Sequence, residues 1–336
     1  MGGHKMTTPQ DVTSVAMALL EHQSPPSEAR RLLARGDNVI LFGPPGTGKS
    51  HAAQVVAGEW EAEHGADSVI NVTFHPAYSY EDFIEGFRPD LKNPGQFILT
   101  PGVLLQAANH ARKTPTLLVI DEINRADVAK VFGEMITYIE RDKREVNFRT
   151  AQQPTVAQAI PEGLHILGTM NTADKSVSLL DVALRRRFRF IDCPPDATAF
   201  ATADGWAEQV AGIYLADLLT GINGRLGGVG IARDRLVGQA LLAVPADGTE
   251  EDLLDRIQYD VYPLIDEYLF GDAERMQTVL PGIVDSNGAL VVADLTVDVL
   301  RGWVPETVEE KGPGDDLTDE NEEAQPTGAE AKTSLA

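Results

Sequence analysis

Short apolar runs alternate with longer segments of helical periodicity over the first 195 residues of the chain. The apolar runs, rich in β-branched residues, lie at 39–42, 69–74, 116–120, 164–170 and 190–191. Helices are predicted at 49–64, 101–113, 128–140 and 177–184. Because strands that alternate with helices pair in parallel through crossover connections, the pattern predicts an α/β domain built on a parallel sheet.

The pattern changes after Pro194-Pro195, which marks a boundary. Helices without strands are predicted beyond it, at 206–226, 233–242, 250–269 and 273–280. The third of these is amphipathic, and Pro263 is expected to kink it. Residues 290–304 form a weak strand or helix remainder, whose Trp303 is expected to pack back on the body. We therefore predict a second, smaller helical domain.

The two ends of the chain differ from the domains between them. Two short helices are predicted from Thr8 to Ala34, separated at Ser24-Pro25-Pro26. After Pro305, acidic runs with Gly, Pro and Thr between them predict a disordered tail. The predicted divisions are N-terminal helices (1–36), an α/β core (37–195), a helical domain with its remainder (196–304) and an acidic tail (305–336).

The sequence pattern does not decide the structural or functional role of three segments of the α/β core. An aromatic-rich segment after the second predicted strand includes Tyr78, Phe83 and Phe87, whose rings either enter the core or grip a polymer by stacking. Residues 141–144 are either a solvated turn or a small basic patch. Residues 145–161 are predicted to form a β-hairpin that projects from the sheet edge.

The composition of the 336 residues is ordinary for a globular protein except in its charge. Hydrophobic residues make up 43% and charged residues 24%, but 28 Lys and Arg against 51 Asp and Glu give a net charge of −23. Because such a surface repels a phosphate backbone, broad sequence-independent DNA binding by the outer surface is not expected. Any DNA contact requires a local basic patch, a central pore or a partner.

The positions of cysteine, histidine and apolar residues bear on disulfides, zinc sites and membrane association. The single cysteine, Cys193, excludes an internal disulfide and indicates a reducing compartment. No histidine pairs with another histidine or with cysteine at zinc-ligand spacing. Because neither a membrane-spanning run nor a secretory signal is found, we predict a cytoplasmic protein without membrane association.

A phosphate-loop pattern stands between the first strand and the helix after it: Gly43, Pro44, Pro45, Gly46, Thr47, Gly48, Lys49 and Ser50, followed by His51. Its glycines let backbone N–H groups point at phosphate oxygens, and the helix N-terminus adds a favourable dipole. Lys49 is expected to reach the β- and γ-phosphates, and the Ser50 hydroxyl to ligate Mg²⁺. These nine residues are the predicted nucleotide site.

Polar residues follow the next two strands of the predicted sheet. Asp121 and Glu122 end the strand at 116–120. Asp121 is expected to hold the water shell of Mg²⁺, and Glu122 to orient or deprotonate the attacking water. Asn171 ends the strand after that, and four arginines within 185–189 stand at a helix end before the final strand.

Together these features resemble the AAA+ ATPase module over about residues 20–285. Within that superfamily, three strings look like the McrB family, the GTP-hydrolysing motors of McrBC modification-dependent restriction systems. They are His75–Gly86 (HPAYSYEDFIEG), Ile120–Ala126 (IDEINRA) and Gly168–Ser176 (GTMNTADKS). The segment 262–272 also resembles the helical lid of that family, and the Met-Asn-Thr-Ala-Asp string is the most specific.

The resemblance implies a sheet of five parallel strands, a helical lid, and a homo-oligomeric ring, usually a hexamer, with nucleotide between subunits. It implies that Lys49 and Ser50 hold the triphosphate and Mg²⁺. Asp121 would support the metal and Glu122 would activate water. Asn171 would be the sensor that positions this water near the γ-phosphate.

The same resemblance assigns an arginine finger that reaches a neighbouring subunit's nucleotide. Arg187 would be this finger, with Arg186 as the close competitor. Such a residue stabilises the charge of the transition state and is worth roughly 10³–10⁵ in rate. Hydrolysis would then depend on assembly.

The chain departs from the family pattern in two places. Motors of this family usually carry a separate N-terminal domain that reads methylated DNA, and the segment before the phosphate loop is too short for one. DNA recognition is therefore expected from a partner or not at all. The lid stretch 236–241 lacks the expected polar residues and a basic residue, so Arg233 or Arg235 is expected to serve as the second sensor.

The nucleotide base is left open between guanine and adenine. The string Asn171-Thr172-Ala173-Asp174 superficially matches a guanine-reading motif of small GTPases. However, Asn171 closes a strand expected beside the Asp121 strand, which places it near phosphate rather than base. GTP is implied by the McrB resemblance, and ATP by the wider superfamily.

Three functions are compatible with these features. The first is a ring-forming NTPase motor in DNA restriction that acts with a McrC-like nuclease and contacts DNA only indirectly or through its pore. The second is a MoxR-like ATPase that remodels or activates a partner protein, which the acidic surface favours over a DNA motor. The third is a nucleotide-dependent scaffold without productive turnover.

Overall fold

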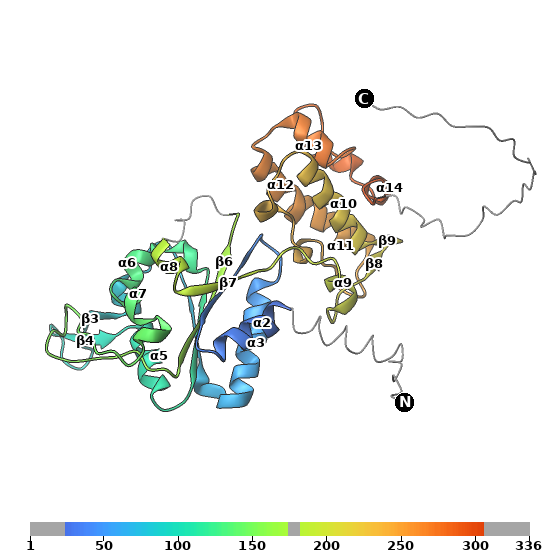
Figure 1. The fold of residues 1–336 in the computed structure, drawn as a ribbon. Coiled ribbons are helices and arrows are strands. Elements are labelled where there is room, and N and C mark those ends of the chain that lie inside the picture. The colour runs from blue at the N-terminus through green and yellow to red at the C-terminus, as the bar shows by residue number, and fades with distance from the viewer. Residues whose placement is uncertain (1–23, 174–181, 306–336) are drawn as a thin grey trace, which may run out of the picture. The chain divides into compact units, whose positions relative to one another are not determined.

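Five parallel strands form the central sheet of the N-terminal part of the chain (Figure 1). The computed structural model describes residues 24–173 and 182–305, all of which belong to one unit ending at Pro305. The strands are β1 (Asn38–Gly43), β2 (Val69–Thr73), β5 (Thr116–Asp121), β6 (Leu164–Asn171) and β7 (Phe188–Asp192). Their order is β2-β5-β6-β1-β7. The five-stranded parallel sheet implied by the resemblance is confirmed.

The three central strands, β5, β6 and β1, are buried on both faces because helices cover both sides of the sheet (Figure 1). Successive side chains alternate between the two layers: Val39 and Leu41 pack on one side, and Ile40 packs on the other. Helices α2 (Pro25–Leu33) and α3 (Lys49–His64) cover the Val39 side. On the Ile40 side lie α5 (Val103–Ala111), α6 (Val128–Phe132) and α7 (Met135–Tyr138).

Three predicted helix boundaries differ in the structure. Pro25-Pro26 begins α2 rather than preceding it, which suits residues without a backbone N–H. The helix predicted from Pro101 begins at Val103, because Pro101 ends a strand. The helix predicted at 128–140 is broken at Gly133, whose φ of 50° is left-handed. The ring of Tyr80 lies so close to Gly133 that an added Cβ would be 3.0 Å from its Cε2 atom.

The aromatic-rich segment forms a short helix and one arm of a hairpin. Helix α4 (Tyr80–Phe83) leads into β3 (Glu85–Pro89), which pairs antiparallel with β4 (Phe97–Pro101). Phe83 is fully buried and Tyr78 packs against the same core, so these two rings are core residues. Phe87, by contrast, is 58% exposed on the hairpin.

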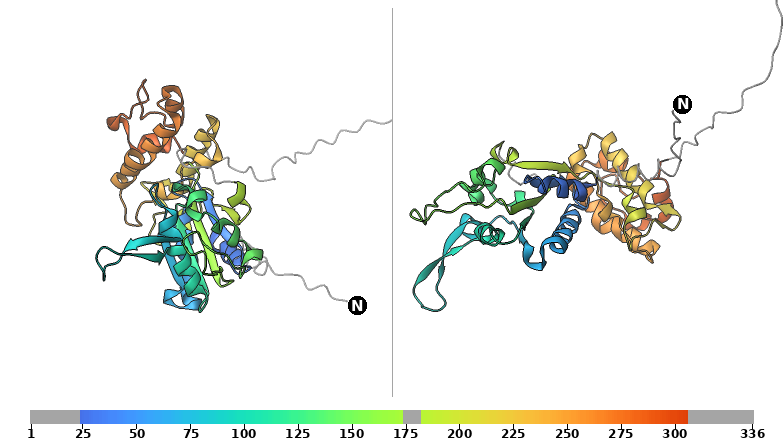
Figure 2. Two further views of the ribbon diagram at one scale, coloured as in Figure 1. Left: turned by 90° about the vertical axis from the view of Figure 1, so that its left-hand side faces the viewer. Right: turned by 60° about the horizontal axis from the view of Figure 1, so that its bottom comes forward.

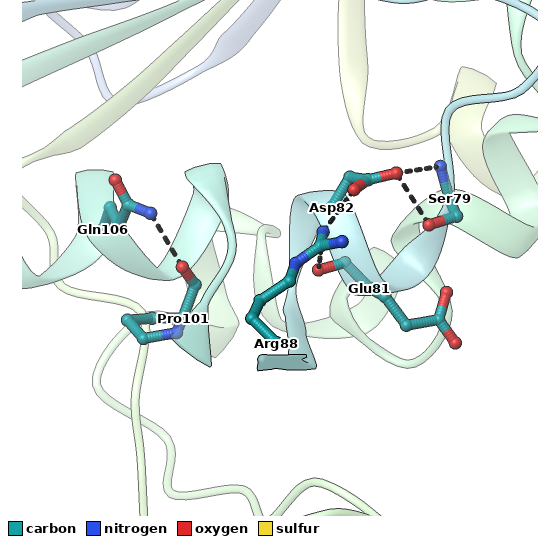
Figure 3. A network of polar contacts seen from close by, with 6 residues as sticks. All are labelled: Ser79, Glu81, Asp82, Arg88, Pro101 and Gln106. Carbon is teal, nitrogen blue, oxygen red and sulfur yellow. Dashed lines mark hydrogen bonds and ion pairs between the residues drawn. The ribbon is translucent and has the colours of Figure 1, made fainter. Parts of the chain in front are cut away.

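Polar contacts anchor the base of this hairpin, as Figure 3 shows. The Asp82 carboxylate accepts hydrogen bonds from the Ser79 hydroxyl and backbone N–H, and it also pairs with Arg88 of β3. At the other arm, Gln106 Nε2 donates to Pro101 O at 2.7 Å. From this base the hairpin extends away from the sheet (Figure 2).

The segment predicted as a second hairpin, 145–161, contains one antiparallel bridge, between Phe148 and Gln158, rather than paired strands. Phe148 is buried against the Tyr138 ring, with centroids 4.7 Å apart. The segment lies beside the β3–β4 hairpin, because Gln153 Nε2 donates to the carboxylate of the fully buried Glu85 at 2.8 Å.

Arg144 is neither a solvated turn residue nor part of a basic patch. Its guanidinium is buried and donates to Asn38 Oδ1 at 3.0 Å and to Pro161 O at 3.4 Å. Burial lowers the pKa of Arg144 to about 10. Because Asn38 Nδ2 donates in turn to Ile139 O and Arg187 O, this network ties the start of β1 to two other segments.

The second domain is mainly helical, as predicted, but it contains one small strand pair. Strands β8 (Gln209–Val210) and β9 (Ile213–Tyr214) occupy the start of the helix predicted at 206–226, so α10 spans Leu215–Gly228. The helix predicted at 233–242 is instead two 3₁₀ turns, Arg233–Arg235 and Gln239–Leu241.

The helical run predicted at 250–269 is continuous but irregular. It comprises α11 (Glu250–Asp255), a π-helical turn (Arg256–Val261) and α12 (Tyr262–Leu269). The π-helical turn ends two residues before Pro263, which has no N–H for a regular helical bond. Helices α13 (Ala273–Val279) and α14 (Val297–Arg301) follow, and Trp303 packs back as predicted, with its Nε1 donating to Pro281 O at 3.0 Å.

Some predictions concern residues outside the described ranges. These are the first N-terminal helix, the acidic tail and most of the helix at 177–184, of which α8 (Val182–Arg185) is described. Among the described helices, none combines the length and the apolar character needed to cross a membrane.

Candidate active site

The phosphate loop connects the end of β1 to the start of α3. Gly46 and Gly48 have left-handed φ values of 76° and 83°, and Gly48 is the N-cap of the helix. At Gly43 an added Cβ would lie 2.3 Å from Cys193 O, so no side chain fits there. Glycines with these dihedrals at a helix N-terminus form a concave group of N–H donors suited to an anion.

Two side chains of the loop are held by the loop itself. Lys49 is 6% exposed, and its Nζ donates to Pro44 O at 2.6 Å. The Thr47 hydroxyl donates to the same carbonyl at 2.9 Å. Lys49 therefore lies over the loop, where a bound phosphate would meet its ammonium group, and His51 lies exposed one residue beyond Ser50.

Asp121 ends β5 opposite the loop and meets the first turn of α3. Ser50 Oγ donates to Asp121 Oδ1 at 3.1 Å, and the Thr169 hydroxyl donates to the same oxygen. A hydroxyl and a carboxylate that converge in this way provide hard oxygen ligands of the kind Mg²⁺ prefers. These residues fit the metal that the sequence predicts.

Glu122 adopts a backbone conformation that is rare outside glycine. Its φ and ψ are 55° and 45°, in the left-handed region. Its N–H donates to Thr169 Oγ1 at 3.1 Å, so one threonine hydroxyl fixes both members of the acid pair. Such strained residues cluster at functional sites because surrounding contacts enforce them.

Asn171, at the end of β6, faces the Glu122 side chain. Its Nδ2 donates to Glu122 Oε1 at 2.5 Å, and its own carbonyl accepts from Asn124 Nδ2 at 2.9 Å. Arg125 Nε lies 3.4 Å from Glu122 Oε2. The sheet thus brings the loop, the acid pair and Asn171 together at one edge.

The predicted finger arginines lie at the opposite edge of the sheet. They precede β7, which runs parallel to β1, whereas the phosphate loop follows β1. A six-residue strand separates the two edges by roughly 20 Å, too far for an arginine to reach the phosphate loop of the same chain. Arg187 Nε pairs with Glu140 Oε1 at 2.7 Å and donates to Ile136 O at 3.1 Å, whereas the Arg186 side chain is exposed.

The second domain closes the site from the other side. A cavity of about 680 Å³ lies beside the loop and is lined by Gly43, Thr172 and Arg233, among others. Thr172 Oγ1 donates to Asp234 O at 2.9 Å. Of the two expected second-sensor arginines, Arg233 borders this cavity and Arg235 does not.

Sequence reasoning did not identify Thr169, Asn124 or Gln239 as site residues. Gln239 is buried, and its Nε2 donates to Thr47 O at 3.1 Å. Thr169 had a detectable signal, because it stands two residues before Asn171 and a strand places such residues on one face. Gln239 had no such signal in the sequence, since its hydrogen-bond partner Thr47 is 192 residues away in the chain.

Cys193 has the role expected of a buried apolar residue. It is 3% exposed at the end of β7, and burial raises the pKa of its thiol to about 11. Its backbone N–H donates to Phe42 O at 2.8 Å, which continues the sheet beside the phosphate loop.

Comparison with known protein families assigns the two domains separately. Residues 38–188 match the AAA domain of the dynein-related subfamily, and residues 214–277 match the alpha-helical lid domain of McrB. These matches cover four of the five strands of the sheet, both residues of the acid pair, Asn171 and the greater part of the helical domain.

Two curated proteins are similar to this chain. The EcoKMcrB subunit of the type IV methyl-directed restriction enzyme of Escherichia coli is 35% identical over 257 residues, which are 71% of this chain and 55% of that protein. The YdiS component of the type II restriction enzyme BsuMI of Bacillus subtilis is 30% identical over 196 residues, 46% of this chain and 56% of that protein. The aligned region spans about half the length of each relative.

Proposed function

We propose that this chain, which belongs to the McrB-like family of AAA domain NTPases, hydrolyses a nucleoside triphosphate with Mg²⁺ at the edge of its sheet. The observation that carries the proposal is the continuous hydrogen-bonded series Ser50, Asp121, Thr169, Glu122 and Asn171. It connects the phosphate loop to a carboxylate placed beside an amide, the arrangement that phosphoryl transfer to water requires.

In this proposal the residues act by positioning and charge rather than by covalent chemistry. The loop N–H groups and Lys49 hold the β- and γ-phosphates. Mg²⁺, held through Ser50 and Asp121, would neutralise charge that develops on the phosphates. Glu122 accepts a proton from the attacking water, and Asn171 keeps the Glu122 carboxylate and that water in line with the γ-phosphate.

We further propose that hydrolysis requires a neighbouring copy of the chain. The edge-to-edge distance of roughly 20 Å means that an arginine before β7 serves a nucleotide only on another subunit. Because Arg187 is engaged with Glu140 and Ile136, Arg186 is the better candidate for the finger, which reverses the order expected from the sequence. A closed ring, such as a hexamer, gives every site such a neighbour.

The names of both relatives support a role in DNA restriction with a partner subunit. We propose a McrC-like nuclease as that partner, with DNA contacted through the partner or the pore. The net charge of −23 favours a second candidate, a MoxR-like ATPase that remodels a protein, because an acidic surface repels DNA. Stimulation of turnover by the nuclease would separate the two.

The test is turnover of GTP and of ATP by the full chain, with its oligomer mass determined in parallel. Glu122→Gln is expected to lower turnover at least about 100-fold while nucleotide binding persists, because the amide cannot accept the proton. Glu162→Gln, a change at an exposed carboxylate away from the site, serves as the matched control. Unchanged turnover in Glu122→Gln would refute the assignment.

A further inference from the structure

Residues 239 and 240 of the helical lid contact the outside of the phosphate loop through two hydrogen bonds. Ala240 N donates to Gly46 O at 2.9 Å, and Gln239 Nε2 donates to Thr47 O at 3.1 Å. Gln239 Oε1 accepts at 3.1 Å from the N–H of Asp196, in the linker that follows β7. One buried amide therefore joins the lid, the linker and the loop.

This contact is sterically close as well as hydrogen-bonded. An added Cβ at Gly238 would lie 2.2 Å from the carbonyl carbon of Gly46. One at Gly46 would lie 2.9 Å from Leu241 Cγ. The backbones of the lid and the loop thus touch over adjacent residues, and the two glycines make that approach achievable.

The two carbonyls that the lid holds belong to consecutive peptide planes of the loop. In a planar trans peptide the N–H of the next residue points away from the carbonyl. A lid that fixes Gly46 O and Thr47 O therefore also fixes the N–H directions of Thr47 and Gly48, on the side away from the lid contacts. These are donors of the anion-binding loop.

We infer that Gln239 is a positioning residue that pre-organises the phosphate-binding N–H groups from outside the loop. The inference rests on the proposed nucleotide site and assigns a function to a lid stretch that offers no basic sensor residue. Because the contact joins lid and loop, phosphate binding and lid orientation are coupled, and each stabilises the other reciprocally.

The experiment measures binding without turnover in the full chain. Competition against a fluorescent non-hydrolysable triphosphate gives the affinities of GTP and ATP analogues and of inorganic pyrophosphate. Gln239→Ala is expected to weaken all three by a similar factor, about 3- to 10-fold, as for one or two lost hydrogen bonds. Gln239→Glu keeps the acceptor for Asp196 N but cannot donate to Thr47 O, so it is expected to lose at least as much.

The control is Gln277→Ala, which removes an exposed lid glutamine that donates to Asp285 O at 2.9 Å, and it is expected to leave all affinities unchanged. Wild-type affinities in both Gln239 variants would overturn the inference. So would a loss confined to the nucleotides with pyrophosphate unaffected, because that indicates contact with base or ribose.

The outcome is separable from that of the proposed function. If the wild-type chain binds triphosphate and pyrophosphate but does not hydrolyse either nucleotide, the hydrolytic function fails, and the Gln239 comparison still decides the inference. If the wild-type chain binds neither ligand, both the site and the role of Gln239 are refuted. Thermal unfolding of each variant, expected within a few degrees of wild type, excludes global loss of structure as the cause.

Discussion

At the scale of single residues, the site depends on side chains that hold other side chains. Thr169 contacts both acids: its hydroxyl donates to Asp121 and accepts from the Glu122 N–H. The left-handed Glu122 backbone is costly without such support, by about 1–3 kcal/mol. The threonine hydroxyl therefore sets the geometry of two residues of the proposed catalytic site.

We predict that Thr169→Val lowers turnover about 10- to 100-fold, while Thr169→Ser retains most of it. Valine matches the shape of threonine but leaves Glu122 N and Asp121 without their shared partner, whereas serine keeps the hydroxyl. Steady-state kinetics should show the loss mainly in kcat, because the phosphate loop is unaltered. A Thr169→Val enzyme with wild-type kcat would contradict this role.

At the scale of elements, the aromatic residues of the β3–β4 hairpin are exposed, whereas the aromatic residue of the helix before it is buried. Phe83, in the helix before it, is fully buried against Phe74 and Phe132. Phe87 and Phe97, on the hairpin, are 58% and 66% exposed. A two-stranded ribbon is marginally stable alone, so the polar contacts at its base and the Glu85 link to the neighbouring segment hold it in place.

We predict that Phe83→Ala lowers the free energy of unfolding by about 3–5 kcal/mol, because it opens a cavity in the core. Phe87→Ser is expected to change it by less than about 0.5 kcal/mol, since the ring is already largely in water. Urea unfolding of the two variants measures both values. An equally large loss in Phe87→Ser would show that the exposed ring is buried by an assembly in solution.

At the scale of the whole molecule, the two ends of the sheet carry different parts of the proposed chemistry. The loop, acid pair and Asn171 lie at the carboxyl ends of β1, β5 and β6, as expected for ligands of parallel sheets. Arg186 and Arg187 lie before β7, at the other edge. This separation is the physical reason why assembly enters the proposed function.

We predict that Arg186→Ala lowers turnover by about 10³-fold without loss of nucleotide binding or stability. Mixing it with Glu122→Gln, which is also expected to be impaired alone, should raise turnover above that of either variant, because some interfaces then combine an intact Glu122 with a neighbour's intact Arg186. Arg149→Ala, at another exposed arginine, is the control. A mixture that forms oligomers yet remains inactive would argue against a shared site.

The Arg187→Ala variant tests the other half of the arginine assignment. Its side chain is 17% exposed and paired with Glu140, so its removal should lower the thermal midpoint, unlike removal of Arg186. If instead Arg187→Ala alone abolishes turnover with unchanged stability, the order implied by the sequence is the right one.

The sequence by itself determined the parallel sheet, the phosphate loop and the residues that end β5 and β6. These features depend on local pattern: a buried strand is a short apolar run, and a phosphate loop is a contiguous string whose glycines satisfy backbone geometry. The family strings added the strand count and the lid, both of which are confirmed. The proposed catalytic roles remain predictions.

Only the tertiary structure decided how distant segments meet. The helix predicted at 128–140 is broken at Gly133, where the ring of Tyr80, more than fifty residues earlier in the chain, lies against the glycine. Arg187 is engaged through Glu140, and Gln239 reaches Thr47, in pairings that no local spacing encodes. The periodicity of apolar residues indicates which face of a helix is buried, but it does not indicate which remote segment packs against that face. Hydrogen bonds between remote segments depend on the packed chain, so these contacts can be identified only in the fold.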